Sequence, residues 1–306
     1  MAAPLPLAPN TGRIFLILAI AVGAVSLSAV FIRLADAPGV VVACYRMVIA
    51  SLLLAPITWR GLRRTPFTRR TLGYTVLAGI FLAIHFAAWI SSLSYTTVAA
   101  SVTLVCTNPL WVALFSWLFL SKPPSLSMLL GVLLAVAGGA MIAFGDLAGG
   151  SAPLLGDGLA LLGALTVSAY LLLGRAAQRA GLGLGAYAGS AYSVAALILL
   201  PVPALFGLPY FEYSGATFGW IFLLAVLPQL VGHTGVNYAM KFLDPTLVAT
   251  MILLEPVVAA LLALLLFTEV PGVVTLLGAV LLLLGVLLTV RFGQARQPAR
   301  PPAAAD

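Results

Sequence analysis

The chain has 306 residues, of which 62% are hydrophobic and only 8% are charged. A soluble domain carries roughly a quarter charged residues, so this composition excludes an ordinary water-soluble protein and indicates a chain that resides in lipid. The net charge is +7, but the basic residues are scattered between apolar runs, which favours membrane orientation over nucleic-acid binding.

Apolar runs of the length needed to span a bilayer, about 20 residues, recur along the whole chain. They predict an all-α membrane protein with ten transmembrane helices, at residues 14–33, 38–58, 72–94, 97–120, 126–144, 156–174, 185–207, 216–239, 246–267 and 273–290. The first run is longer than the core of a signal peptide and has no basic start, so we expect it to be a true span. The ends, 1–13 and 293–306, are rich in Pro and Ala and are expected to be flexible.

The Lys and Arg residues predict the orientation. With ten spans, all 15 of them except Arg33 and Arg46 fall in segments on one side, the largest group lying in residues 60–70. Because basic loops remain in the cytoplasm, both termini are predicted to be cytoplasmic. We expect a multi-pass protein of the bacterial inner membrane, monomeric, with a small solute and lipid as its partners.

The two halves, residues 14–145 and 156–292, are related by an internal repeat of 147 residues, the separation of Pro109 from Pro256. Five spans per half is an odd number, so the second half enters the membrane from the opposite side. Such inverted-topology repeats are typical of transporters that open a central site alternately to either side. Other pairs at this spacing are Tyr45/Tyr192 and Thr103/Thr250, and His85/His233 is one residue longer.

A short motif follows the mid-membrane proline in each half. It reads Glu255-Pro256, Phe267-Thr268-Glu269, Pro271 and Gly278 in the second half, and Asn108-Pro109, Leu120-Ser121-Lys122, Pro124 and Gly131 in the first. With Arg46 in the second span, this pattern resembles the EamA family of the drug/metabolite transporter superfamily. The resemblance covers residues 14 to 291. Lys122 stands where the family usually has glutamate, so only Glu269 retains that acidic group.

The resemblance implies ten spans and export of metabolites or amino acids, coupled to a proton or ion gradient or to none. The aromatic-rich spans and His85 are similar to the aromatic amino-acid exporters within the family.

Polar and aromatic residues midway along the spans are the expected substrate site. Ionisable groups there cost roughly 2.5–3.5 kcal/mol on insertion scales, so they are rare and usually functional. Glu255 could bind a proton, a cation or an ammonium group, or could be a protonated group joining two helices. The expected substrate-binding residues are His85, Trp89, Asn108, Trp111, Tyr170, Tyr192, Asn237 and Glu255.

Structural roles compete with binding at several of these positions. Asn108 occupies the place of Glu255 in the first half and could equally join helices, and each aromatic residue taken singly is more often core packing. For His85 solute binding is favoured, because Trp89 lies one turn further on the same helix face. For His233 a neutral, structural histidine is favoured.

Two prolines and two charges complete the expected set. Pro109 and Pro256 are predicted hinges, because a mid-helix proline frees a backbone carbonyl and kinks the helix. Arg46 and Glu269 are predicted structural charges. Arg46, near the outer end of its span, would snorkel to the interface or pair with a carboxylate such as Asp36.

Signatures of other protein classes are missing from the sequence. It contains no G-x-x-x-x-G-K-[ST], His-Glu-x-x-His or G-x-S-x-G motif, so we expect neither an ATP motor, a cofactor nor a metal, and not an enzyme. The predicted function is export of amino acids, aromatic or broad range, or of similar small metabolites, by alternating access. A multidrug or cationic-compound exporter is the main alternative; a nucleotide-sugar carrier and an intramembrane lipid-modifying enzyme are weaker ones.

Overall fold

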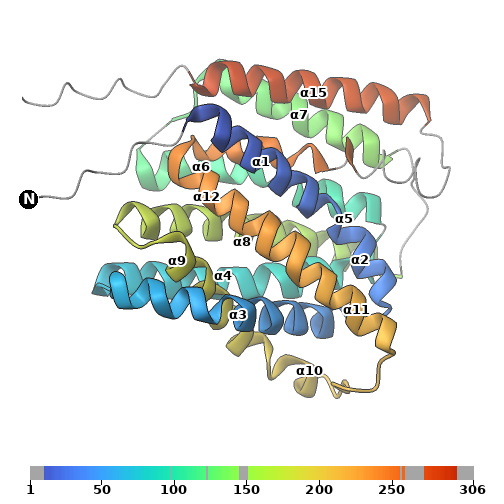
Figure 1. Cartoon of the computed structure of the whole chain (residues 1–306). Helices are drawn as coiled ribbons and strands as arrows, with labels where there is room; N and C mark the ends of the chain where they lie inside the picture. Colours follow the sequence, from blue (N-terminus) through green and yellow to red (C-terminus); the bar gives the residue numbers. More distant parts are fainter. Residues whose placement is uncertain are drawn as a thin grey trace, which may run out of the picture.

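The structure, a computed structural model, describes residues 10–96, 98–121, 123–144, 151–255, 257–258 and 272–294. Within these ranges the chain forms helices and no strand, and the helices lie side by side in one bundle (Figure 1). Six helical segments are long and apolar enough to cross a membrane, and three shorter apolar helices accompany them in the part described. The all-α membrane fold is therefore confirmed, while the number of ten spans stays a prediction.

The helices of the first half follow the predicted spans. They are α1 (Thr11–Ser26), α2 (Ser28–Ala35), α3 (Gly39–Arg64), α4 (Arg69–Ser92), α5 (Val98–Val105), α6 (Asn108–Leu120) and α7 (Leu126–Phe144). α1 and α2 form one apolar segment. Thr68 and Thr71 form a reciprocal capping box at the start of α4. Because it satisfies amide groups that the first turn leaves unpaired, it fixes where this helix begins.

The second half repeats this series of helices. They are α8 (Pro153–Arg179), α9 (Leu184–Leu199), α10 (Val202–Leu205), α11 (Gly215–Leu224), the π-helix η1 (Ala225–His233), α12 (Thr234–Phe242), α13 (Pro245–Ile252) and α15 (Val273–Gln294). The side chain of Asp244 caps α13 by accepting from Thr246 N at 2.9 Å. The end of the predicted span 246–267 lies outside the described residues, as do the predicted hinge Pro256 and Glu269.

The predicted continuous span 97–120 is two helices. α5 ends at Val105, Cys106 and Thr107 form a turn, and α6 begins at Asn108. The amide of Thr107 bonds only three residues back, to Leu104 O at 3.2 Å. Pro109 follows as the second residue of α6; it has no N–H to donate and its ring excludes the preceding helical carbonyl. A kink was the expectation, and the structure has a complete break one turn before the proline.

The same break recurs in the second half. α13 ends at Ile252, one repeat period after Val105, and Leu253 and Leu254 form the turn. The amide of Leu254 again bonds three residues back, to Met251 O at 3.2 Å. Glu255 follows this turn as Asn108 follows the first. The helix break is therefore repeated in both halves, although the residue that follows it is Asn108 in one half and Glu255 in the other.

The third span of the second half contains a π-helix where α4 is a regular α-helix. η1 spans Ala225–His233 and holds Pro228. Hydrogen bonds in a π-helix join residues five apart instead of four, so one of its turns holds an additional residue. His233 follows His85 by one residue more than the repeat period. η1 therefore accommodates the extra residue and leaves His233 in the position that matches His85.

α4 packs against α8 and α9, α3 packs against α9, and α1 and α2 lie against η1, α11 and α12. Glycines allow close approach of these helices. A Cβ atom added to Gly163 on α8 would lie 3.1 Å from Trp89 Cβ on α4, and one added to Gly79 would lie 2.8 Å from Ala191 O on α9. These contacts fix the helix that carries His85 and Trp89.

α7 and α15 pack against each other at one edge of the bundle (Figure 1). Their glycines make reciprocal contacts. A Cβ added to Gly138 would lie 2.6 Å from Gly278 O, and one added to Gly285 would lie 2.6 Å from Gly131 O. The contacts pair the start of one helix with the end of the other, so the two helices are antiparallel and joined by small residues, as is common in membranes.

Candidate functional site

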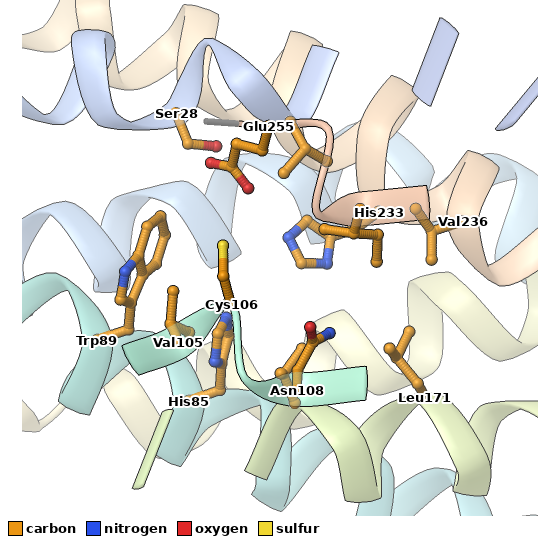
Figure 2. Close-up of a pocket in the computed structure, with 13 residues that line it drawn as sticks. Ser28, His85, Trp89, Val105, Cys106, Asn108, Leu171, His233, Val236 and Glu255 are labelled. Atoms are coloured by element: carbon orange, nitrogen blue, oxygen red, sulfur yellow. The ribbon is translucent and has the colours of Figure 1, made fainter. Parts of the chain in front are cut away.

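A pocket lies between the two halves of the chain (Figure 2). Most of its wall is apolar, with a few polar groups, which is the usual composition of a small-molecule site. The lining residues are Val25, Ser28, His85, Trp89, Val105, Cys106, Asn108, Val167, Leu171, His233, Val236, Ile252 and Glu255. Of the residues expected to bind substrate, His85, Trp89, Asn108 and Glu255 are brought together here.

The two helix breaks deliver polar groups to the pocket. Cys106 and Asn108 come from the break between α5 and α6, and Glu255 comes from the break after α13. In Figure 2, Glu255 and Ser28 lie on one side of the pocket, opposite Cys106, Asn108 and His85. Non-helical backbone at membrane depth is tolerated where it is buried in protein or lines a cavity, and discontinuous helices form the binding sites of many transporters.

Among the described lining residues, three fully buried polar atoms have no hydrogen-bond partner: Ser28 Oγ, Trp89 Nε1 and Asn108 Oδ1. All three side chains are buried, with at most 5% of their surface exposed. Leaving a buried polar atom unpaired costs about 1–3 kcal/mol. A solute with hydrogen-bond donors and acceptors would remove this cost, so the pocket suits a molecule that is partly apolar and partly polar.

His85 is fixed by a backbone contact across the helix interface. Its Nδ1 lies 2.9 Å from the carbonyl oxygen of Gly163 on α8. Since a carbonyl only accepts hydrogen bonds, Nδ1 carries the proton and Nε2 keeps a lone pair. The imidazole stacks on Trp89, with ring centroids 5.8 Å apart and planes at 10°. The two side chains expected on one face of this helix thus form one wall.

Tyr170, Tyr192 and Asn237 do not line the pocket but form a buried polar layer beside it. Asn237 Nδ2 donates to the Tyr170 hydroxyl, and the Tyr192 hydroxyl lies 3.1 Å from Thr234 Oγ1. The ring of Tyr170 is 6.4 Å from that of His233, which does line the pocket. Direct binding by these three residues stays a prediction.

Trp111 also lies outside the lining, and its Nε1 donates to Thr107 Oγ1 at 3.2 Å. Conversely, His233, Cys106 and Ser28 line the pocket although the sequence did not single them out as binding residues. The position of His233 opposite His85 in the repeat was the available signal. Nothing in the sequence distinguished Cys106 or Ser28 from other small residues of the spans.

Arg46 lies in the core of the bundle and not at its surface. Its side chain is 0% exposed, its Nε donates to Gln229 Oε1 on η1 at 2.8 Å, and its Cζ lies 4.0 Å from the centre of the Phe86 ring. It therefore neither snorkels nor reaches Asp36, which is exposed at the end of α2. Gln229 was missed; a polar residue midway along a span was the signal that would have found it.

Among the described residues, no group of three or more His, Cys, Asp and Glu side chains could hold a metal ion. What the pocket offers is one carboxyl group, hydrogen-bonding atoms and an aromatic wall. These groups can bind and orient a small solute.

Comparisons with known proteins agree with a transporter fold. Two curated relatives, each called an uncharacterized transporter, come from Clostridium kluyveri and Archaeoglobus fulgidus. The first is 26% identical over 256 residues, covering 78% of this chain and 79% of the relative. The second is 28% identical over 254 residues, covering 81% and 86%. A solved crystal structure superimposes on 94% of this chain and 100% of its own, with a TM-score of 0.75 and 19% identity; this likeness concerns the fold alone.

The family match is more specific than these pairwise similarities. The sequence model of the EamA-like transporter family matches twice, over residues 11–144 and 154–291, one match in each half. The two matches include both helix breaks and the described lining of the pocket. The chain therefore belongs to the EamA-like transporter family and is a multi-pass membrane transporter of small substrates.

Proposed function

We propose that the protein exports amino acids, aromatic or broad range, or similar small metabolites. The observation that carries this proposal is the pocket in which Glu255 faces an aromatic wall and unpartnered polar atoms. Glu255 would bind the ammonium group of the solute. His85 and Trp89 would contact its side chain, and Asn108 Oδ1 would accept a further hydrogen bond.

Alternating access is the proposed mechanism. The matching helix breaks and the reciprocal glycine contacts of α7 and α15 support ten spans arranged as an inverted repeat. The break before Pro109 is the proposed hinge of the first half, and Pro256 that of the second. Exchange of conformation between the halves would open the pocket first to one side and then to the other.

The proposed orientation places both termini in the cytoplasm of a bacterial cell, with residues 60–70 on the same side. Single cysteines introduced at Arg63 and in the tail after residue 294, in a Cys44→Ser/Cys106→Ser background, should be labelled by a membrane-impermeant maleimide only after the cells are opened. Labelling of either position in intact cells would contradict the topology.

The substrate proposal is tested in proteoliposomes. Purified full-length protein should exchange labelled phenylalanine or threonine across the bilayer faster than empty vesicles do. If neither amino acid moves faster than in empty vesicles, the proposal is wrong. Coupling to protons or to another ion is tested in the same vesicles by imposing each gradient in turn.

A cationic-compound exporter is the second candidate, because a buried carboxyl beside aromatic rings also suits an organic cation. The two candidates separate on Glu255→Gln. If cations are the substrates, the variant loses resistance to cationic dyes in cells and keeps amino-acid exchange unchanged. If amino acids are the substrates, it loses amino-acid exchange.

A further inference from the structure

Arg46 has more hydrogen-bond donors than partners. A guanidinium group carries five N–H donors, and in Arg46 only Nε is paired, with Gln229 Oε1 at 2.8 Å. Nη1 and Nη2 have no partner, and neither does Nε2 of Gln229. Both side chains are 0% exposed. A buried charge left in this condition is costly and normally has a counter-ion.

No described carboxylate serves as that counter-ion. Asp36 and Glu212 are exposed, Asp157 accepts from Thr96 at 2.9 Å, and Asp244 caps α13. Glu255 is the one buried acid among the described residues. It is within electrostatic range of Arg46 but does not hydrogen-bond to it.

Arg46 does not line the pocket, but aromatic contacts connect it to residues that do. Arg46 rests on Phe86, whose ring is 5.3 Å from His233, and His233 is 6.4 Å from His85. Both histidines line the pocket. Gln229, the partner of Arg46, precedes His233 by four residues in η1. Phe86 therefore contacts both the guanidinium of Arg46 and the ring of His233.

We propose that Arg46 and Gln229 bind the carboxylate of a zwitterionic substrate whose ammonium group is held by Glu255. Two parallel N–H···O bonds from a guanidinium match the geometry of a carboxylate, and Nε2 of Gln229 offers a further donor. The inference rests on the proposed function and narrows it: the solute carries both charges, as an α-amino acid does.

Movement of the π-helix η1 would give the carboxylate of the substrate access to Arg46. His233 lines the pocket, contacts the Phe86 ring on which Arg46 rests, and is the last residue of η1. π-helical turns are frequent at functional sites, and conversion of such a turn to a regular helix shifts the following segment by one residue, a rotation of about 100°. Such a rotation would move His233 aside and bring the carboxylate of the solute to Arg46, which would link substrate binding to movement of this span.

The test compares charge-deleted analogues in proteoliposomes loaded for exchange of labelled L-phenylalanine. L-Phenylalanine amide lacks the carboxylate and 3-phenylpropionate lacks the ammonium group. With the wild-type protein, both should compete on the order of 30-fold more weakly than unlabelled L-phenylalanine, because each leaves a buried charge unpaired. This arm needs no substitution and is independent of whether a variant folds.

The variant Arg46→Gln identifies the residue responsible. In this protein the amide should compete as well as phenylalanine, while 3-phenylpropionate stays weak. Arg46→Lys, which keeps the charge and loses the planar pair of donors, should recover part of the discrimination. Arg33→Gln, at the exposed end of α2, is the matched control and should discriminate as the wild type does.

The outcomes are distinguishable. Equal competition by phenylalanine and its amide in the wild type, or discrimination that persists in Arg46→Gln, overturns the carboxylate site and leaves amino-acid export standing. Transport of no amino acid overturns the proposed function, and the zwitterion proposal falls with it. If 3-phenylpropionate then still raises the melting temperature of the wild type but not of Arg46→Gln, only the anion site survives.

Discussion

The two halves of the pocket are alike in backbone and unlike in charge. The fourth span of each half breaks at the same repeat position, but Asn108 follows the first break and Glu255 the second. Arg46 of the first half has Ser193 at the matching position of the second. The repeat therefore decides where the pocket is, whereas residues present in one half alone decide its charge. The symmetry of the backbone therefore does not extend to the charged residues that would select the substrate.

A second contrast separates the two histidine-bearing spans. α4 is a regular helix fixed against α8 and α9, whereas its counterpart is interrupted by η1. His85 has a backbone partner at 2.9 Å. We interpret α4 as the static wall of the pocket and η1 as its movable wall.

The largest expected effect comes from deleting one residue in each of these spans. Deleting Ile80 turns the two parts of α4 by about 100° relative to each other and removes one face from its partners, so little folded protein should be recovered. Deleting Pro228 removes the extra residue of η1 and lets the segment become a regular helix in unchanged register. Size-exclusion profiles and melting temperatures of both proteins check this; equal loss of folded protein would contradict the assignment of η1.

Next in size is the effect of Glu255→Gln on transport. Exchange of labelled phenylalanine should fall on the order of 100-fold, because a buried charge-assisted contact to the ammonium group is lost. Glu212→Gln, exposed between α10 and α11, should exchange at the wild-type rate. The double variant Asn108→Glu/Glu255→Asn should stay inactive, since the relocated carboxyl faces the opposite side of the pocket; recovered exchange would mean that the halves are equivalent.

A smaller effect is expected where the halves do match, at α7 and α15. In Gly138→Ala the new methyl group meets the backbone of α15, whereas in Gly139→Ala the nearest atom is Leu282 Cδ1 at 3.8 Å. Gly138→Ala should therefore lose about 1–3 kcal/mol of stability by overpacking, and Gly139→Ala little. Melting temperatures in detergent give the difference. Gly285→Ala, the reciprocal position, should match Gly138→Ala if the two helices are equivalent.

The smallest effect concerns the static wall. Trp89→Phe keeps a six-membered aromatic ring and removes the five-membered ring with its unpartnered Nε1 donor. If the solute accepts a hydrogen bond there, the concentration for half-maximal exchange should rise about fivefold, corresponding to roughly 1 kcal/mol. Trp117→Phe, 55% exposed on α6, is the control. If the concentration for half-maximal exchange is unchanged in Trp89→Phe, Trp89 contributes packing alone and donates no hydrogen bond to the solute.

Predictions from single residues succeeded where one local rule decides. Apolar run length placed the helices, and the spacing of four residues placed His85 and Trp89 on one wall. The predicted position of Arg46 at the membrane interface was wrong, because the distance of a residue from the end of a span does not show which helix lies opposite it. The π-helix was also missed, because composition does not show which backbone groups are hydrogen-bonded. The one sign of it in the sequence was the extra residue between His85 and His233.

Three properties could be read from the amino-acid sequence alone: the chain resides in a membrane, it contains an internal repeat, and a proline occurs at the same place in the fourth span of each half. These properties follow from hydropathy and backbone chemistry, which act within a few neighbouring residues. The packing of the helices was needed to show that Glu255, Trp89 and Asn108 share a pocket and that Arg46 is buried against Gln229. Such contacts join residues far apart in the chain, and they depend on how the helices turn and pack against one another.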